Sequence, residues 1–394
     1  MTLYLTACGV ACALGADKTE VASALFAGRH GLMTRTDLLA ARPVQVGAVQ
    51  APLPTPPAGL EALDCRNNRL MLLVLRQIAP EIRAAIARFG AARIAVVLGT
   101  STGGIAEAES ALASRQRTGA WPDGFHYRSQ VPGALARFAA DALGITGPAC
   151  AVTTACSSSA KVFAVARRLI RAGLADAAVV GGADTLCRMT LGGFHALEAL
   201  SPTCCNPFSV HRDGITIGEG AAAFLLTPDP GPVALLGVGE ASDAHHPTAP
   251  DPDGRGAAAA MAGALADAGL DAGEIAYINL HGTATPLNDA MESRAVARLF
   301  PPGMPCSSTK ALTGHMLGAA GGVEAAFLWL TLHPALGPGV LPPHAWDGQA
   351  DPALPPLNLI GVGTKLPPGD RLAMLSSSFG FGGSNVALVL GRTG

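Results

Sequence analysis

Strand–loop–helix units recur in both halves of this chain and set limits on its fold. Apolar runs of strand length stand at 93–100, 176–184 and 276–280, and small or polar residues and then a helical pattern follow each of them. Strands that alternate with helices form buried sheets with helices on their faces. The sequence therefore predicts an α/β fold in which the second half repeats the style of the first, as an internal duplication would.

A proline-rich segment at 228–233 precedes a new strand and is the best candidate for a boundary. It divides the chain into an N-terminal half (1–230) and a C-terminal half (231–394). Residues 41–59 are also rich in proline, and we expect them to form an extended surface segment. The apolar spacing over residues 68–88 predicts one long helix.

The composition favours a large core and restricts the classes of partner. Of the 394 residues, 49% are hydrophobic and 14% are charged, and the formal net charge is −2. Such a composition suits a large core and an extensive subunit interface. Without a basic field the chain gives no indication of nucleic-acid binding. No uninterrupted apolar run reaches membrane-spanning length, so we expect no membrane span.

The nine cysteines are spread over the chain without a CxxC pair, although Cys204 and Cys205 are adjacent. This spacing is neither a disulfide framework nor a zinc pattern, so the sequence predicts no metal and a reducing, cytoplasmic location. The opening MTLYLTACGVACALGA is similar to a short signal peptide, but no basic residue precedes Lys18. We therefore expect a first strand that ends in a turn.

Residues 150–173 place a cysteine at the start of an amphipathic segment. Cys156 stands between small residues, and apolar side chains then recur at helical spacing up to a plausible stop at Gly173. A helix start offers unpaired N–H groups and the positive end of a dipole, which favour a thiolate over a thiol. On this stretch alone, a nucleophile and an inert buried cysteine are equally good interpretations.

Four polar residues stand at similar junctions in the second half. His281 follows a strand, Lys310 and His315 are five residues apart, and Glu324 lies in the next helix. Taken singly, each is explained as well by solvation or ordinary pairing. Together with Cys156 they indicate thioester chemistry, because cysteine is a good acyl carrier and two imidazoles near its sulfur could stabilise an enolate.

Five motifs carry a resemblance that covers nearly the whole chain. They are TTACSSS around Cys156, PFSVHRDGITIGEGA at 207–221, HGTATPLND at 281–289, STKALTGHMLGAAGGVEA at 308–325 and SFGFGGSN at 378–385. In this order they resemble the β-ketoacyl-acyl-carrier-protein synthases of the thiolase superfamily, closest to the elongating (type I/II) branch. The resemblance implies a thiolase fold, which is a five-layer αβαβα sandwich of two similar halves. It also implies substrates carried on the phosphopantetheine of acyl carrier protein, with no cofactor.

The resemblance implies a role for each matching residue. Cys156 would be the acyl-accepting nucleophile, His281 and His315 the two catalytic histidines, and Lys310 and Glu324 the polar residues that hold the second histidine and its loop. Relatives first move an acyl group from a carrier-protein thioester to the cysteine. A malonyl-carrier protein then loses CO2, and the resulting enolate attacks the acyl-cysteine.

Four further positions match the family outside this catalytic group. Phe381 would be the gate beside the nucleophile, and its backbone N–H and that of Cys156 would form the oxyanion hole. Thr283 and Thr285 would meet the phosphopantetheine arm. Phe194 would lie near the acyl pocket.

The chain departs from the family pattern at two positions. Asn288 stands near a position where relatives often have glycine, so the histidine loop could be reshaped. Glu198 stands where several fatty-acid relatives have a basic residue that faces the acidic carrier protein. Arg66 and Arg69 remain candidates for carrier-protein docking, and a solvated helix face explains them equally well.

Three alternative functions share this fold. A non-catalytic partner subunit would usually lack the nucleophile, whereas Cys156, His281 and His315 are all present. A coenzyme A-dependent thiolase carries a second reactive cysteine in the closing loop, where this chain has Phe381. The chain-initiating synthase branch has asparagine in place of the second histidine, and His315 argues against it.

The resemblance also bears on partners and pathway. Family members dimerise through strands of the N-terminal half, so we expect a homodimer or a dimer with a related ketosynthase-like subunit. The opening YLTACGVACALG and the loop HGTATPLNDAMES are similar to ketosynthases of bacterial aryl-polyene pigment clusters. Ordinary fatty-acid elongation is the alternative.

Overall fold

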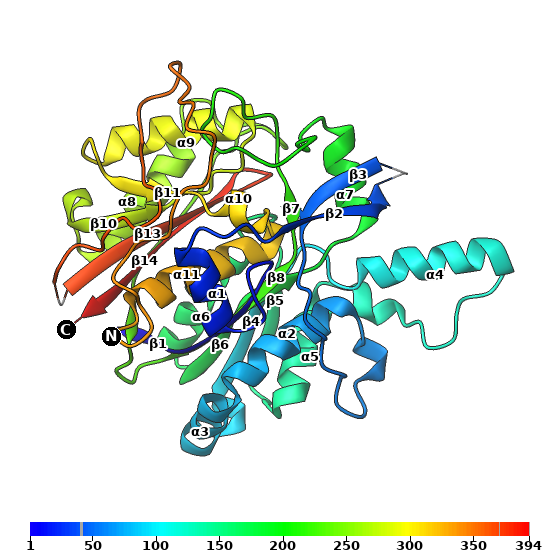
Figure 1. Cartoon of the computed structure of the whole chain (residues 1–394). Coiled ribbons are helices and arrows are strands. Elements are labelled where there is room, and N and C mark those ends of the chain that lie inside the picture. Colours follow the sequence, from blue (N-terminus) through cyan, green and yellow to red (C-terminus); the bar gives the residue numbers. More distant parts are fainter. Residues whose placement is uncertain (40–41, 370, 394) are drawn as a thin grey trace.

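Two sheets with the same strand order form the framework of the chain, and the computed structural model describes residues 1–39, 42–369 and 371–393 (Figure 1). The strands of the first sheet are β1 (Leu3–Ala11), β4 (Ile94–Gly99), β5 (Ala149–Val152), β6 (Ala177–Asp184) and β8 (Gly220–Thr227). Those of the second are β9 (Val233–Ser242), β10 (Ile275–Asn279), β11 (Pro305–Ser307), β13 (Arg371–Gly380) and β14 (Ser384–Thr393), with a short β12 (Asn358–Leu359) beside β11.

The two sheets repeat one topology. The order β5-β4-β6-β8-β1 in the first half matches β11-β10-β13-β14-β9 in the second. In each half the strand at the second position pairs in parallel with both neighbours, and the following pairs are antiparallel. An antiparallel pairing of β1 with β9, in which Leu3 lies opposite Leu235, joins the sheets of the two halves into one continuous 11-stranded sheet. The expected duplication is therefore present in the fold.

Helices cover both sheets and fill the space between them. Between the sheets lie α6 (Ser158–Arg171) and α11 (Ala320–Leu332), which contact strands of both halves. The outer layers are formed by α2 (Arg66–Gln77), α3 (Ala79–Phe89) and α5 (Gly133–Leu143) on one side and by α8 (Arg255–Ala268) and α9 (Pro286–Leu299) on the other. This arrangement is the expected five-layer αβαβα sandwich.

Smaller elements surround these layers. They are α1 (Lys18–Phe26), α4 (Ile105–Thr118), α7 (Arg188–Ala196), α10 (Lys310–Thr313) and a three-stranded sheet of β2 (Leu32–Leu39), β3 (Arg42–Gly47) and β7 (Ile217–Gly218). In Figure 1, α4 stands away from the body of the molecule. No helix in the described ranges is long and apolar enough to cross a membrane.

The central helices approach each other closely at their N-terminal ends. A Cβ added at Gly321 would lie 2.8 Å from the Cβ of Ala160, so a larger residue cannot be accommodated there without movement. The N–H of Gly322 donates to Ser159 Oγ at 2.8 Å. Every residue of α11 is buried, which agrees with its apolar sequence. This crossing brings together the loops that precede α6 and α11.

Two expectations about local structure were wrong. Residues 41–59 are not only a surface excursion, because β3 forms a strand in which Val44 and Val46 are buried; residue 41 lies outside the described residues. Residues 68–88 belong to two helices, α2 and α3, because Pro80 lacks the N–H that a continuous helix would need. The boundary expected at 230–231 stays a prediction.

Candidate active site

A tight turn carries Cys156 from the end of β5 to the start of α6. Ala155 adopts a positive φ of 50°, a region that residues other than glycine rarely occupy. The hydroxyl of Ser158 donates to the Ala155 carbonyl at 2.6 Å and accepts from the Thr154 N–H at 2.9 Å. Cys156 therefore stands two residues before α6, at the helix start that the sequence predicted, with its side chain buried.

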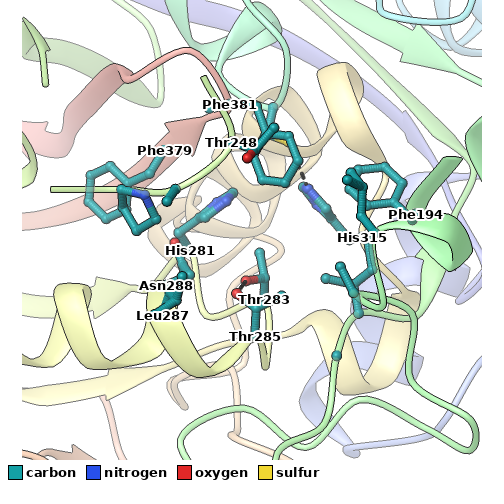
Figure 2. Close-up of a pocket in the computed structure, with 18 of the residues that line it drawn as sticks. Phe194, Thr248, His281, Thr283, Thr285, Leu287, Asn288, His315, Phe379 and Phe381 are labelled. Atoms are coloured by element: carbon teal, nitrogen blue, oxygen red, sulfur yellow. Dashed lines mark hydrogen bonds between the residues drawn. The ribbon is translucent and has the colours of Figure 1, made fainter. Parts of the chain in front are cut away.

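Two histidines from the second half, His281 and His315, lie on different loops and converge on one site (Figure 2), where both are close to Cys156. His281 follows β10 and His315 follows α10, and both side chains are buried. Nε2 of His315 lies 3.0 Å from Sγ of Cys156. The two imidazole rings point toward each other, nearly perpendicular, with their centroids 5.3 Å apart. Cys156 and two histidines that lie 125 and 159 positions further along the chain thus form one buried group of a thiol and two imidazoles.

Burial and a nearby cation keep both imidazoles neutral. Burial and the positive charge of Lys310 hold the pKa of His315 well below its usual range. The pKa of His281 is lowered for the same reasons and by His315 as well. A neutral imidazole carries one N–H donor and one acceptor, so each ring can donate a hydrogen bond to an oxygen in the site.

The pKa of the Cys156 thiol is shifted in the opposite direction from that predicted from the sequence. Burial raises its pKa to about 12, although Lys310 and the backbone N–H groups of Phe381 and Cys156 act in the opposite direction. The helix start that was expected to favour a thiolate is therefore outweighed by the loss of water around sulfur. The proton therefore stays on sulfur, next to His315.

Lys310 and Glu324 form a buried ion pair behind the histidines. Both side chains are 1% exposed, and Nζ of Lys310 donates to Oε1 of Glu324. Burial raises the pKa of Glu324, and Lys310 opposes this shift. Lys310 supplies the charge that lowers the pKa of both histidines, and Glu324 is its hydrogen-bonded partner.

Two buried carboxyl groups that the sequence interpretation did not single out hold the His281 loop. Glu292 accepts from the N–H groups of His281 and Gly282, both at 2.7 Å. Asp289 accepts from the N–H of Phe208 at 2.7 Å and from that of Ala284 at 3.2 Å. Their spacing of three residues puts both on one face of α9, which is a signal visible in the sequence.

Burial makes these two carboxyl groups unusually hard to ionise. It raises the pKa of Glu292 to about 7 and that of Asp289 to about 6, against the hydrogen bonds that they accept.

Positive φ angles at Ala284 (66°) and Leu317 (49°) show that the loops around the histidines are held in unfavourable backbone conformations. Such strain costs on the order of 1–3 kcal/mol per residue and persists where the surroundings impose it.

A cavity of ≈ 290 Å³ opens onto Cys156 and both histidines. Thr283 and Thr285 line it, with their hydroxyl oxygens 3.2 Å apart. Phe194 and Phe381 also line it, and their ring centroids are 5.7 Å apart. The site therefore has an apolar compartment beside a polar one.

The closing turn contributes two phenylalanines with different surroundings. Phe381 is 39% exposed, between glycines that include Gly382 at a φ of 84°. Phe379 is 6% exposed and packs on His281 with a centroid distance of 5.7 Å, so it belongs to the core.

The residues at which the chain departs from the family pattern line the same cavity. Glu198 is exposed, at a positive φ of 53°. Asn288 is buried and donates to Asp289 Oδ1 at 3.2 Å, so it takes part in holding the histidine loop.

Arg66 and Arg69 lie elsewhere and are engaged in ion pairs. Arg66 donates to the buried Glu219 at 2.6 Å, and Arg69 donates to Asp64 at 2.5 Å. Neither arginine lines the catalytic cavity.

The thiol and the two histidines also meet the geometric condition for a metal site. Sγ of Cys156 and one nitrogen from each ring lie within 4.8 Å of one another. These are ligand types that zinc accepts.

Both halves of the chain match domains of one known protein family. The Beta-ketoacyl synthase N-terminal domain matches residues 57–230, and the C-terminal domain of that family matches residues 233–345. 3-Oxoacyl-[acyl-carrier-protein] synthase 2 of Staphylococcus aureus (strain COL) is 31% identical over 344 residues, which are 82% of this chain and 81% of that protein. Nodulation protein E of Rhizobium meliloti is 32% identical over 98% of both chains.

Solved structures agree in fold. A chain of the complex of a ketosynthase (ApeO) with its chain length factor (ApeC) from Xenorhabdus doucetiae is 46% identical, with a TM-score of 0.94 and coverage of 100% of this chain and 98% of that one. A chain of the ishigamide ketosynthase/chain length factor is 28% identical, with a TM-score of 0.86 and coverage of 100% and 99%. The chain therefore belongs to the β-ketoacyl synthase family and is an acyltransferase of the 3-oxoacyl-[acyl-carrier-protein] synthase type with the thiolase fold.

Proposed function

We propose that the chain joins malonyl-acyl-carrier protein to an acyl group held on Cys156 by decarboxylative Claisen condensation. The observation that carries this proposal is the distance of 3.0 Å between Cys156 Sγ and His315 Nε2, with the ring of His281 facing them. A thiol in this position can hold an acyl group as a thioester while both imidazoles face the same cavity.

In the first half-reaction the sulfur of Cys156 attacks the thioester carbonyl of an acyl-carrier protein. Because burial keeps the thiol protonated, its proton passes to His315 Nε2 as the carbon–sulfur bond forms, and from there to the departing pantetheine sulfur. The N–H groups of Cys156 and Phe381, which lower the pKa of the thiol, stabilise the oxyanion of the tetrahedral intermediate.

In the second half-reaction malonyl-carrier protein loses CO2 to give an enolate. Neutral His281 and His315 each donate one N–H to the thioester oxygen as negative charge develops on it. The enolate carbon then attacks the carbonyl of the acyl-cysteine and the carbon–sulfur bond breaks. The Cys156 thiolate takes up a proton from solvent, because its own proton left with the pantetheine thiol in the first half-reaction. Lys310 acts through the histidines, whose pKa values its charge lowers, and Glu324 acts through Lys310, with which it forms the buried ion pair. These two half-reactions require no cofactor.

The remaining cavity residues bind the substrate arms. Thr283 and Thr285 offer hydroxyl groups to the amides of phosphopantetheine, and Phe194 borders the acyl chain. Phe381 acts as a gate, since a partly exposed aromatic ring among glycines can move at little cost. For carrier-protein docking, the ion pairs of Arg66 and Arg69 leave part of each side chain, 39% and 38%, exposed for contact with an acidic partner.

We further propose that the working unit is a dimer, either of two copies or with a related ketosynthase-like chain. The segment around α4 carries exposed apolar side chains, among them Leu112, Trp121 and Tyr127. Such exposed apolar surface is typical of an interface. The titles of two similar structures name a chain length factor as the partner of the ketosynthase. Light scattering at micromolar concentration, with and without a co-expressed related subunit, should give a dimer mass in at least one case; a monomer in both would contradict the proposal.

For the pathway we propose an aryl-polyene-type ketosynthase. The opening segment and the histidine loop support this assignment, as does the 46% identity to a chain of the ApeO and ApeC complex. Incubation with malonyl-carrier protein and a panel of saturated and polyenoyl carrier proteins, with product masses as the readout, should give extension of the polyenoyl chains. Extension of saturated chains alone would assign the chain to fatty-acid elongation.

Separating the two half-reactions tests the function itself. Cys156→Ala should abolish acyl transfer but retain malonyl decarboxylation, because the histidines remain. His315→Ala should strongly reduce decarboxylation. It should slow acylation of Cys156 to a smaller extent without abolishing it, because the proton of the thiol then has to leave without the imidazole. Cys150→Ala, a change at an exposed cysteine, is the matched control and should affect neither. Equal loss of both half-reactions in either catalytic variant would contradict the roles, and a wild-type chain that accepts no acyl group would be a non-catalytic partner subunit.

A further inference from the structure

The adjacent cysteines Cys204 and Cys205 line a second hollow in the molecule. Its volume is ≈ 360 Å³, and none of its lining residues lines the catalytic cavity. Cys204 is half-buried and Cys205 is buried. His30, Ala311 and His344 also line this hollow. The hollow therefore places a partly accessible thiol directly beside a second, sheltered one.

The two thiols differ in acidity because they interact with each other and are unequally buried. The interaction with Cys205 lowers the pKa of Cys204, whereas the interaction with Cys204, together with burial, raises that of Cys205 well above its usual range. Burial raises the pKa of Cys156 to about 12, and that side chain is only 6% exposed. Since thiolates react with oxidants and thiols do not, Cys204 should react before the catalytic cysteine.

Short contacts connect the pair to the catalytic loops. The N–H of Cys205 donates to Thr216 Oγ1 at 2.9 Å, and the carbonyl of Thr216 accepts from the N–H of His315 at 2.6 Å. On the other side, Sγ of Cys204 lies 3.9 Å from the carbonyl oxygen of Ala311, the residue after Lys310. A change in the cysteine segment therefore reaches both His315 and Lys310 through neighbouring residues.

We propose that Cys204 and Cys205 form a peroxide-sensitive modification site that closes to a disulfide between adjacent residues. The Cys204 thiolate attacks an oxygen of hydrogen peroxide, so that an S–O bond forms, the O–O bond breaks and hydroxide leaves. The sulfur of Cys205 then attacks that of Cys204, the S–S bond forms, the S–O bond breaks, and the hydroxide leaves as water with the proton of Cys205. Two thiols and one peroxide thus give one disulfide and two waters.

The disulfide formed in this way is strained and should be easy to reduce. Consecutive Cα atoms are about 3.8 Å apart, whereas disulfide-linked residues usually lie roughly 4.4–6.8 Å apart. Strained disulfides are the labile ones. Closing the ring also changes the backbone at Cys204 and Cys205, which are held by Ala311 and Thr216. The effect of this movement on condensation rests on the proposed function, whereas the formation of the disulfide does not.

Mass spectrometry tests the chemistry without reference to activity. Trypsin releases residues 189–212, a peptide that contains Cys204 and Cys205 and no other cysteine. After mild peroxide treatment of the intact protein, this peptide should lose two hydrogen atoms and should regain them on reduction. In Cys205→Ser, where the second step is blocked, Cys204 should instead be trapped as an adduct of dimedone. If the peptide keeps both thiols while Cys156 is oxidised, or if no adduct forms in Cys205→Ser, the proposal is wrong.

Activity measurements test the connection to the catalytic loops. Peroxide should reduce malonyl decarboxylation by the wild type by roughly ten- to a hundredfold, as small displacements of catalytic groups do, and a thiol reductant should restore it. Cys204→Ser should keep its basal activity and resist peroxide. Cys150→Ser, which alters an exposed cysteine elsewhere in the chain, should remain sensitive. Disulfide formation without any change in decarboxylation would overturn the proposed connection. If peroxide inactivates Cys204→Ser as fast as it inactivates the wild type, the damage lies at another residue and the connection is also wrong. If the untreated protein lacks decarboxylation altogether, the proposed function fails while the disulfide is still judged by mass.

Discussion

Replacing Lys310 with methionine removes the charge that lowers the pKa of both His281 and His315. Lys310 and Glu324 are both 1% exposed, so neither can exchange its partner for water. Breaking a buried pair by removing one member costs about 3–5 kcal/mol, because the other charge is left without compensation. Lys310→Met should therefore lower the free energy of unfolding by about that amount, as measured by urea denaturation.

Two further variants make this prediction specific. Lys310→Met combined with Glu324→Gln should recover much of the lost stability, because no charge remains buried. Lys365→Met alters an exposed lysine and should change stability by less than about 0.5 kcal/mol. If Lys310→Met is as stable as Lys365→Met, the ion pair contributes little and the reasoning from burial fails.

The same substitution should also change the pH dependence of decarboxylation. A histidine that must be neutral loses activity as the pH falls through its pKa. Burial and Lys310 hold the pKa of His281 and His315 well below the usual range, so wild-type activity should persist at mildly acid pH. Without the lysine charge these pKa values rise, and the acid limb should move to higher pH. An unchanged pH profile would show that Lys310 does not control the histidines.

Three other predictions follow from the cavity and its supports. Phe381→Ala should raise malonyl decarboxylation without an acyl-enzyme, relative to condensation; a wild-type ratio would reject the gate. Because burial raises the pKa of Glu292 to about 7, its contribution to stability is complete below its usual pKa of 4.5 and falls as the pH rises to about 7. Glu292→Gln should remove up to roughly 1.4 kcal/mol per pH unit of this slope in urea denaturation, and an identical slope would contradict the shift. Thr283→Val with Thr285→Val should raise the KM for carrier-protein substrates more than it lowers kcat, and the opposite pattern would exclude pantetheine binding.

The sequence located the main catalytic candidates because each stands at a strand–helix junction in a pattern of small residues. Cys156 precedes an amphipathic segment, and His281 directly follows an apolar strand. Such local patterns are sufficient to predict where a strand ends and a helix begins. The duplication was also visible, since both halves use the same units. The prediction of a single long helix over residues 68–88 was wrong because it rested on the spacing of apolar residues alone. Pro80 cannot continue a helix, and it lies at the start of the second of the two helices found there.

The electrostatics of the site could not be predicted from local sequence. The raised pKa of Cys156 depends on burial by segments more than 100 residues away, including His315 and the turn around Phe381. A helix start alone suggested the opposite direction. The spacing of Asp289 and Glu292 in the sequence indicates that both lie on one face of α9. Only the fold shows that Glu292 binds the backbone N–H of His281. The ion pair of Arg66 with Glu219 joins residues 153 positions apart and has no local signature.

Intact-protein mass spectrometry of a single turnover tests the central claim most directly. The protein is first mixed with acyl-carrier protein alone and then with malonyl-carrier protein. We predict a mass increase equal to the acyl group, located on the peptide that contains Cys156, followed by its loss as the β-ketoacyl-carrier protein appears. Cys156→Ala should show neither step. A β-ketoacyl product formed without an acyl group on Cys156, or an acyl-Cys156 that malonyl-carrier protein does not discharge, would contradict the account.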